Sequence, residues 1–283
     1  MQVFLNGSIL TEKEAVISVF DHGFLYGFGL FETLRSYKGR LFLWEEHYHR
    51  LKSAAHEFQI QMNKSLPQLQ NDIYQTMEAN GLQDAYIRIT LSGGPEGLGL
   101  HGEEHQEPTW LIMAKPLGVQ PETKKLVSLN LRRSTPEGFR RAKSLSFANN
   151  MLAKKELAGR GLGSSEGLFF NEKGHIVEGT VSNIFFVKDD ILYTPHEDTG
   201  LLSGVTRNFI LRLCLEKGIP YKEGFYTLSE LQEAEEIFVS NSVQEIIPVE
   251  ELNHEPVPKV KGPVTSVLLE QYQLSVHKLG DET

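Results

Sequence analysis

The sequence predicts an α+β protein with two domains, and three observations lead to this prediction. Short runs rich in β-branched and aromatic residues, bounded by Gly, Asn or Asp, predict strands joined by tight turns. Stretches with apolar residues at helical spacing lie among these strands. The segment 115–125, KPLGVQPETKK, is polar, contains proline and has no periodicity, which indicates a domain boundary. We expect residues 1–117 to form a small α+β domain, 118–125 a linker and 126–283 a larger domain.

The first domain is predicted to contain antiparallel strands and two helices. VFLNGSIL predicts a hairpin because Asn6-Gly7 supplies the positive φ values of a tight turn. Helices are expected over residues 44–58, where apolar residues recur at helical spacing, and over residues 65–82, which Gly81 ends. Further strands are expected at residues 15–20, in a hairpin over 31–43 that turns at Lys38-Gly39, at 85–92 and at 109–117.

The second domain is predicted to combine strands and helices in a similar way. Residues 166–195 are expected to form three strands, broken by turns at Lys173-Gly174 and Asp189-Asp190. Residues 205–218 predict an amphipathic helix that Gly218 ends. The other elements are expected as strands at 126–133 and 235–242, and as helices after Lys143, at 228–234 and at 263–280.

The composition is that of an ordinary globular protein and excludes several function classes. The chain has 283 residues, a net charge of -9 and a pI of about 5.6, so it lacks the basic excess typical of nucleic-acid-binding proteins. The single cysteine, Cys214, excludes an internal disulfide and fits a reducing compartment. We see no signal peptide and no apolar run of transmembrane length. A cytoplasmic protein that binds neither nucleic acid nor membrane is expected.

Residues 203–206 form a candidate anion site at the start of a predicted helix. Free N–H groups and the helix dipole favour an anion at such a place, and Thr206 would add a hydroxyl donor. The simpler alternative is that Ser203 caps the helix and that nothing binds there.

Glu178 and Lys143 are the candidate charged groups. Glu178 lies in HIVEGTVSNIFFV, among residues typical of a buried strand, and buried carboxylates are rare unless paired. The alternative is an edge-strand glutamate that faces water. Lys143 stands just before a predicted helix, where the helix dipole disfavours a positive charge. Partial burial would lower its pKa and let its amine attack a carbonyl; the alternative is a solvated surface lysine.

Two other patterns are assigned to structure rather than to chemistry. Gly23, Gly27 and Gly29 suggest a nucleotide loop, but they lead into a strand-like segment, whereas a dinucleotide fingerprint leads into a helix. His47 and His49 are two residues apart on a predicted helix and face different ways, so no metal site is expected.

Together, the candidate groups match the needs of one cofactor. A lysine can hold an aldehyde, a glutamate can pair with a ring nitrogen, and a helix N-terminus can bind a phosphate. Pyridoxal 5′-phosphate (PLP) requires all three.

The sequence resembles the fold-type IV family of PLP enzymes over nearly its whole length. That family includes branched-chain aminotransferases, D-amino-acid aminotransferases and 4-amino-4-deoxychorismate lyases. The resemblance implies a small α/β domain, a larger pseudo-barrel-like domain, and a homodimer in which the small domain of one subunit closes the site of the other. The segments that carry it are FDHGFLYGFGLFETLRSYKG, HRLKSAA, KSLSFANNMLAKKEL, VEGTVSNIFFV, LLSGVTRNFI and EIFVSNSVQEIIPV, in the family's order and spacing.

The same resemblance implies a role for individual residues. Lys143 matches the catalytic lysine that bonds to the cofactor aldehyde, and Glu178 matches the glutamate that pairs with the ring nitrogen. Leu202 matches the apolar residue that packs against the ring. The implied phosphate ligands are Arg50, Val205, Thr206 and Ser242.

The likeness is strongest to the bacterial aminodeoxychorismate lyases, which implies conversion of aminodeoxychorismate to 4-aminobenzoate and pyruvate in folate biosynthesis. D-amino-acid aminotransferases carry a tyrosine where this chain has Phe31, and an Arg-x-His carboxylate trap that RITLSGGPEGLGLHG lacks. GPEGLGL resembles the lyase loop. The substrate carries two carboxylates, so cations should line its pocket. Arg35, Arg88 and His101 are the candidates.

Three further expectations complete this interpretation. An aminodeoxychorismate synthase would be the upstream enzyme. A branched-chain or D-amino-acid aminotransferase of the same fold is the main alternative. A PLP-binding or phosphate-binding protein without turnover is a remote one, because a phosphate binder needs neither Lys143 nor Glu178.

Overall fold

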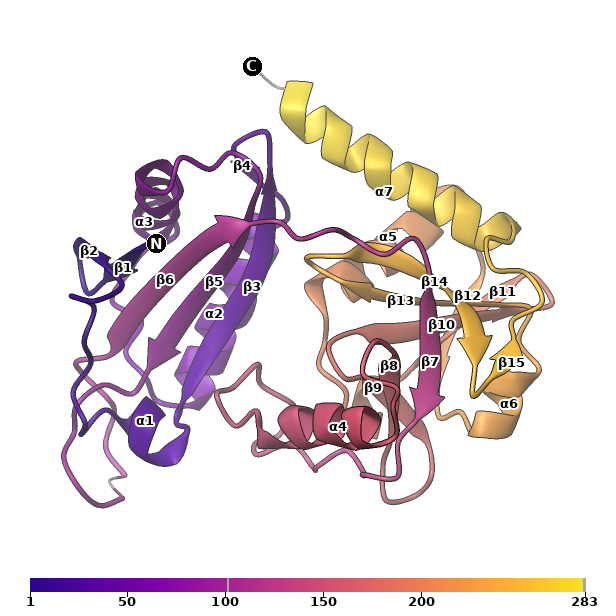
Figure 1. The fold of residues 1–283 in the computed structure, drawn as a ribbon, viewed down its shortest axis with the longest axis horizontal. Coiled ribbons are helices and arrows are strands. Elements are labelled where there is room, and N and C mark those ends of the chain that lie inside the picture. The colour runs from indigo at the N-terminus through magenta and orange to yellow at the C-terminus, as the bar shows by residue number, and fades with distance from the viewer. Residues whose placement is uncertain (101, 282–283) are drawn as a thin grey trace. The chain divides into compact units, whose positions relative to one another are not determined.

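The computed structural model describes residues 1–100 and 102–281, which form two compact units, each with its own sheet (Figure 1). Unit 1 contains Met1–Gly118, Ala142–Phe147 and the C-terminal segment from Lys278. Unit 2 contains Val119–Arg141 and Ala148–His277. The two-sheet α+β fold predicted from the sequence is confirmed. The domain boundaries predicted at residues 117 and 126 stay a prediction.

Residues 142–147 were expected in the second domain, but they pack with unit 1. Backbone hydrogen bonds explain this placement, since Phe31 donates its N–H to the carbonyl of Lys143 at 2.8 Å. Leu145 likewise donates to the carbonyl of Gly29 at 2.8 Å. The segment that carries Lys143 is therefore tied to a strand of unit 1 rather than to the helix that follows it.

Unit 1 has an antiparallel six-stranded sheet in the order β2-β1-β6-β5-β3-β4, with two long helices. The predicted hairpin at Asn6-Gly7 and the turn at Lys38-Gly39 are confirmed, and all four residues have positive φ. The elements are β1 (Gln2–Leu5), β2 (Ser8–Thr11), α1 (His22–Tyr26), β3 (Gly29–Tyr37), β4 (Arg40–Leu41), α2 (Trp44–Glu57), α3 (Leu66–Ala79), β5 (Ala85–Ser92) and β6 (Thr109–Pro116).

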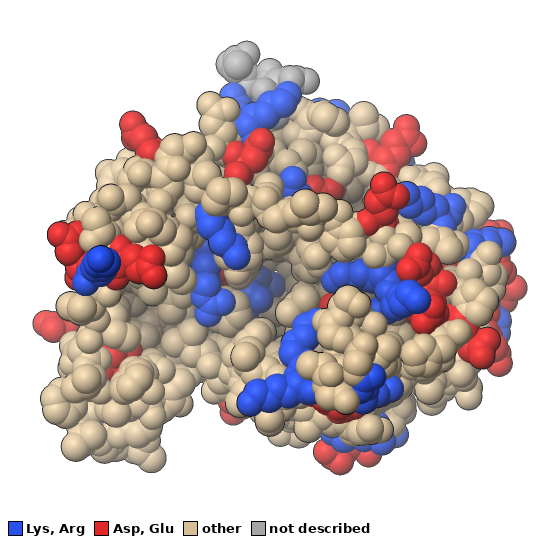
Figure 2. Space-filling model, in the orientation of Figure 1, with Lys and Arg blue, Asp and Glu red and all other residues tan. Residues whose placement is uncertain are grey.

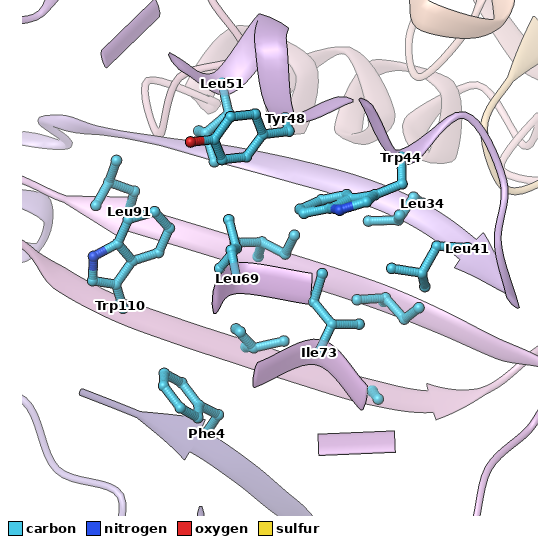
Figure 3. Close-up of a cluster of buried hydrophobic side chains, with 14 of the residues drawn as sticks. Phe4, Leu34, Leu41, Trp44, Tyr48, Leu51, Leu69, Ile73, Leu91 and Trp110 are labelled. Carbon is cyan, nitrogen blue, oxygen red and sulfur yellow. The ribbon is translucent and has the colours of Figure 1, made fainter. Parts of the chain in front are cut away.

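The two faces of this sheet differ because side chains alternate along each strand. One face packs against α2 and α3 and forms the apolar core of the unit. The opposite face, which we call the Phe31 face, presents Phe31, Thr33 and Arg35 of β3, Tyr86, Arg88 and Thr90 of β5, and Leu111, Met113 and Lys115 of β6. Figure 3 labels side chains of the core, namely Phe4, Leu34, Leu41, Trp44, Tyr48, Leu51, Leu69, Ile73, Leu91 and Trp110.

Unit 2 contains a nine-stranded sheet in the order β12-β11-β10-β13-β14-β7-β8-β9, with β15 paired to β14. The sheet is strongly curled, because β9 at one end contacts β10 and β11 near the other end. The strands are β7 (Lys124–Ser128), β8 (Glu166–Phe170), β9 (Ile176–Gly179), β10 (Asn183–Lys188), β11 (Ile191–Pro195), β12 (Tyr221–Gly224), β13 (Glu236–Asn241), β14 (Glu245–Leu252) and β15 (Glu255–Pro256). The helices are α4 (Ala148–Gly159), α5 (Val205–Lys217), α6 (Leu228–Gln232) and α7 (Pro263–Asp281), of which α7 belongs to unit 2 only as far as His277.

Both faces of the unit 2 sheet are covered by apolar packing. Leu168 and Phe170 of β8 belong to one buried cluster, while Phe169 between them belongs to another that includes Leu157 of α4. A strand that is buried on both faces needs a continuous apolar run, and GLFF in β8 supplies it.

Several predicted elements differ from the structure. The strand expected at residues 15–20 is absent, and its apolar side chains are exposed instead of paired in a sheet. Residues 166–195 form four strands rather than three, because a turn closed by the bond from Gly179 N–H to the Ser182 carbonyl at 2.7 Å separates β9 from β10. The strand expected at residues 126–133 ends at Ser128, and β14 was not predicted.

Charge is unevenly spread over the surface in view. In Figure 2, acidic and basic side chains mix at the right of the viewed face, whereas its lower left is almost free of both. Among the described helices, none is both long enough and apolar enough to cross a bilayer.

Replacing Leu69 by alanine should destabilise unit 1, because Leu69 on α3 is fully buried in the core of Figure 3. We expect the free energy of unfolding, measured by urea denaturation, to fall by about 2–5 kcal/mol. The matched control is Leu215→Ala on α5, where the leucine is 68% exposed. This control should change the free energy by less than about 0.5 kcal/mol. Equal effects of the two substitutions would contradict the assigned core.

Candidate active site

Glu178 is a buried carboxylate on β9 whose two oxygens are both hydrogen-bonded. Arg133 donates from Nε to Oε1 at 2.8 Å, and the backbone N–H of Leu202 donates to Oε2 at 2.9 Å. The guanidinium of Arg141 lies 3.9 Å from Oε1. The glutamate is only 5% exposed, so it does not face water as the simpler explanation requires. A buried charge with this set of partners is typical of an organised site.

Two buried arginines surround this single carboxylate. Arg133 also donates from Nη1 to the side-chain oxygens of Asn149 at 2.8 Å and Asn150 at 3.2 Å. Arg141 donates to backbone carbonyls, including that of Gly200. Burial, together with the neighbouring charge of Arg133, lowers the pKa of Arg141 below its ordinary value. Both arginines still remain charged, so the cluster has an excess of positive charge around Glu178.

The start of α5 has no side-chain cap. Its N-cap residue is Gly204, so the alternative in which Ser203 caps the helix is wrong. The first N–H groups of an α-helix have no partner within the helix. Here these groups belong to Val205 and Thr206, and the Thr206 hydroxyl lies 3.3 Å from that of Ser242. Two of the predicted phosphate ligands are therefore neighbours in the structure.

The segment that leads into α5 is held in place from both sides. Glu178 accepts the N–H of Leu202, and Asn183 donates from Nδ2 to the carbonyl of the same residue at 2.9 Å. At Gly204 a Cβ atom would lie 2.0 Å from Oδ1 of Asn183, so only glycine fits this contact. Leu202 and the N-terminus of α5 thus have a fixed position relative to Glu178.

The donors near the start of α5 fit a phosphate group. They are the N–H groups of Val205 and Thr206 and the hydroxyls of Thr206 and Ser242. Ser240 adds a buried hydroxyl that has no hydrogen-bond partner among the described residues. Ser240 lies opposite Asn183 in the β10–β13 pair, so their side chains share one face of the sheet. A set made of donors, at the positive end of a helix dipole, favours an anion.

Lys143 lies on unit 1, outside any helix, since α4 begins only at Ala148. Its side chain is half-buried, and Nζ lies 4.4 Å from the centroid of the Phe31 ring. The guanidinium of Arg88 lies 3.9 Å from the same centroid. Contacts of this kind are favourable for a cation that is partly removed from water. Two predicted site residues therefore meet around one aromatic ring.

The Phe31 face of unit 1 is rich in cations. Arg35 and Arg88 lie on it, as does Lys115 at the end of β6. None of the residues at Phe31-face positions of β3, β5 and β6 is acidic. Burial lowers the pKa of Arg88 below its ordinary value, and the guanidinium still remains charged. His101, the third substrate candidate, lies outside the described residues.

Arg50 lies on the opposite side of the same sheet, on α2, where it contacts a buried carboxylate. It donates from Nε to Oε1 of Glu32 at 2.8 Å and from Nη2 to Oε2 at 2.7 Å. His47 donates from Nδ1 to Oε2 at 2.8 Å. Sequence reasoning gave no role to Glu32 and none beyond structure to His47. Among the described residues, no group of His, Cys, Asp or Glu side chains is arranged to hold a metal ion.

Arg133, Arg141 and Glu32 are among the residues of these clusters that sequence reasoning missed. Glu32 had a usable signal, since it is a carboxylate at a core-facing position between Leu30 and Leu34. The same signal pointed to Glu178. Arg133 had none, because its partners are distant in the chain and no local pattern marks them.

Comparisons with known proteins give a consistent result. The sequence model of the family described as amino-transferase class IV matches residues 29–252. The aminodeoxychorismate lyase of Bacillus subtilis is 37% identical over 98% of this chain and 95% of its own length. A putative branched-chain-amino-acid aminotransferase of Methanocaldococcus jannaschii is 35% identical, with 96% of each chain covered. The branched-chain aminotransferase of the archaeon Thermoproteus uzoniensis, solved with norvaline, superposes with a TM-score of 0.89 at 30% identity, over 100% of this chain and 96% of that one.

Replacing Gly204 by alanine should destabilise unit 2, because the added methyl group would overlap Oδ1 of Asn183. We expect the free energy of unfolding in urea to fall by about 1–3 kcal/mol. The control is Gly159→Ala at the end of α4, where a Cβ would meet no atom within 4 Å. That substitution should be neutral, or stabilising by about 0.5–1 kcal/mol. A Gly204→Ala protein as stable as the control would refute the close contact.

Proposed function

Since the chain belongs to the class IV aminotransferase family, whose members use PLP, we propose that it is a 4-amino-4-deoxychorismate lyase. The reaction converts aminodeoxychorismate to 4-aminobenzoate and pyruvate, a step of folate biosynthesis. An aminodeoxychorismate synthase would supply the substrate. The observation that carries the proposal is the cationic, acid-free Phe31 face beside Lys143, because the substrate has two carboxylates.

The cofactor contacts are assigned residue by residue. Lys143 would bond to the aldehyde carbon, and Glu178 would pair with the ring nitrogen. Leu202 would pack against the ring. The proposed phosphate ligands are Arg50, Val205, Thr206 and Ser242. The donor set at the start of α5, and the absence of a carboxylate in it, support the phosphate assignment.

Bound PLP supplies an electron sink for a carbanion at the carbon that bears the substrate nitrogen. Lys143 is the proton carrier in our proposal. With the cofactor bound, the amine of Lys143 would take the proton from that carbon and return one to the departing pyruvate. Glu178 would favour a proton on the ring nitrogen by pairing with its charged form. Arg133 holds the carboxylate of Glu178 in one orientation through the 2.8 Å bond to Oε1.

Arg88 and Arg35 are proposed to bind the substrate carboxylates. Both lie on the Phe31 face, and Arg88 shares the Phe31 ring with Lys143. A guanidinium can bind a carboxylate through two parallel hydrogen bonds. We keep His101 as a third proposed contact. Phe31 has no hydroxyl to offer, which favours a substrate other than a D-amino acid.

An aminotransferase acting on branched-chain or D-amino acids is the second candidate. The 35% identity to the putative branched-chain-amino-acid aminotransferase of Methanocaldococcus jannaschii favours this candidate. The co-substrate of such an aminotransferase, 2-oxoglutarate, carries two carboxylates and would suit the same cationic face. Both reactions begin with proton removal by the same lysine, so the residues that hold the cofactor do not separate them.

The protein is also proposed to form a homodimer. Residues 16–24 of unit 1 expose five large apolar side chains. A cluster of exposed apolar side chains indicates a surface that binds another protein. Their exposed fractions range from 46% at Phe20 to 76% at Val16. The five are Val16, Ile17, Val19, Phe20 and Phe24, which we call the 16–24 patch. The family resemblance makes a second copy of this chain the expected partner.

PLP-loaded protein should release 4-aminobenzoate and pyruvate when coupled to an aminodeoxychorismate synthase and chorismate. Lys143→Ala should lower the rate at least about 10³-fold, because the proton carrier is lost. Lys155→Ala, which removes an exposed lysine of α4, should leave the rate unchanged. Parallel reactions offer leucine or D-alanine with 2-oxoglutarate and measure glutamate. Formation of glutamate without 4-aminobenzoate would show that the protein is an aminotransferase and not a lyase.

The double substitution Val19→Glu and Phe24→Glu should convert a dimer to a monomer, because it places charges in the 16–24 patch. Sedimentation velocity at micromolar concentration measures the change. Leu215→Glu, at an equally exposed leucine of α5, should leave the dimer intact. A wild-type protein that is already monomeric, or a double variant that remains dimeric, would reject this interface.

A further inference from the structure

Glu32 is a buried anion at an unusual position in unit 1. It lies on the core-facing side of β3, between Leu30 and Leu34, and is only 1% exposed. Every other residue on that side of the strand is uncharged. Placing a carboxylate in an apolar core is costly unless partners compensate for the lost water. The position therefore requires an explanation beyond packing.

The partners of Glu32 come from one face of α2. His47 and Arg50 are three residues apart on the helix, so their side chains lie together. Arg50 makes two parallel bonds to the carboxylate at 2.8 and 2.7 Å, which fixes the plane of its guanidinium. His47 donates from Nδ1 to Oε2 at 2.8 Å, and is itself only 1% exposed.

The charge states of the three groups follow from their surroundings. Burial alone would raise the pKa of Glu32, but the charges and hydrogen bonds of Arg50 and His47 together hold it well below its ordinary value. Burial, together with the charges of Arg50 and Lys143, lowers the pKa of His47 despite the opposing effect of Glu32. At neutral pH the cluster consists of one anion, one cation and a neutral imidazole that donates a hydrogen bond.

We propose that Glu32 and His47 are positioning residues that fix the guanidinium of Arg50 so that it can bind the phosphate of the cofactor. This inference rests on the proposed function, which assigns Arg50 to that phosphate. An arginine side chain has many rotamers, and holding it in one geometry before the ligand arrives removes an entropic cost from binding. Glu32 fixes two nitrogens of the guanidinium, while the Arg50 side chain as a whole remains 18% exposed.

β3 also joins this cluster to the proposed catalytic lysine. Phe31 precedes Glu32 in the strand, donates its N–H to the carbonyl of Lys143 and carries the ring next to Nζ. The register between β3 and β5 runs without a break from Gly29 to Arg35. One rigid strand thus places the partner of Arg50 on one face and the contact of Lys143 on the other.

Loss of Glu32 has two opposing effects on a phosphate. Removing an anion beside Arg50 would by itself strengthen the attraction between the arginine and the phosphate. Replacement by glutamine also removes at least one of the two hydrogen bonds that orient the guanidinium, because an amide has a single acceptor oxygen, and it takes the buried counter-charge away from a cation at the edge of an apolar core. A long side chain in that situation turns toward water. We expect the loss of orientation to dominate, because the cation then leaves the place where the phosphate would bind.

The test compares the binding of PLP and of pyridoxal, which has the same ring and aldehyde but no phosphate. In Glu32→Gln the Kd for PLP should rise about tenfold or more, whereas the Kd for pyridoxal should stay within about twofold. Both constants come from absorbance or fluorescence titration of protein stripped of cofactor, so no turnover is needed. Asp72→Asn, which removes a carboxylate paired with Lys64 in the same unit, is the matched control and should alter neither Kd.

Two substitutions of His47 test the same inference if Glu32→Gln folds poorly. His47→Asn keeps a donor near the position of Nδ1, and His47→Leu removes it. The asparagine variant should bind PLP within about threefold of wild type, and the leucine variant should bind it about fivefold or more weakly. Pyridoxal binding should be the same for both, because neither touches the ring.

Arg50→Gln separates failure of this inference from failure of the proposed function. A selective loss of PLP affinity in Arg50→Gln, with unchanged affinity in Glu32→Gln and His47→Leu, would overturn the positioning role alone. Unchanged PLP affinity in Arg50→Gln would remove the phosphate assignment and the inference with it. Equal losses for PLP and pyridoxal in the Glu32 and His47 variants would mean that the two residues only stabilise the fold, and would also overturn the inference.

Discussion

The carboxylate of Glu178 is the interaction on which the arrangement of unit 2 depends. It joins β9 to Arg133, which precedes α4 in the chain, and to the backbone of Leu202, which precedes α5. A single charged group thereby sets the position of three segments that are distant in sequence. Since every oxygen of the buried group has a partner, the segments cannot shift independently without leaving a polar atom unpaired. The geometry around the start of α5 is a consequence of that constraint.

Unit 1 uses the same physical solution with different elements. Glu32 extends from a strand whose register is fixed over its length, and its partners extend from one face of a packed helix. In each unit, a carboxylate on a strand fixes side chains or chain segments that would otherwise be mobile.

Local chemistry explains which features were predictable from sequence. The turns at Asn6-Gly7 and Lys38-Gly39 need positive φ, and the residues that tolerate it mark them directly. Residues 15–20 have the composition of a strand, but composition does not reveal whether a neighbouring strand exists. Lys143 and Glu178 were candidates from their residue types and positions, and the resemblance to a family supplied their specific roles. Arg133 escaped notice because a salt bridge across 45 residues of chain leaves no local pattern.

The alternation of Phe31 and Glu32 along β3 has a consequence for how this protein can change during evolution. Inserting or deleting one residue in the strand would exchange its two faces, and would move a carboxylate onto the cationic face while burying an aromatic ring against Arg50. One such change would therefore disrupt both the contact between Glu32 and Arg50 and the contact between Phe31 and Lys143. The strand should therefore reject any change of length.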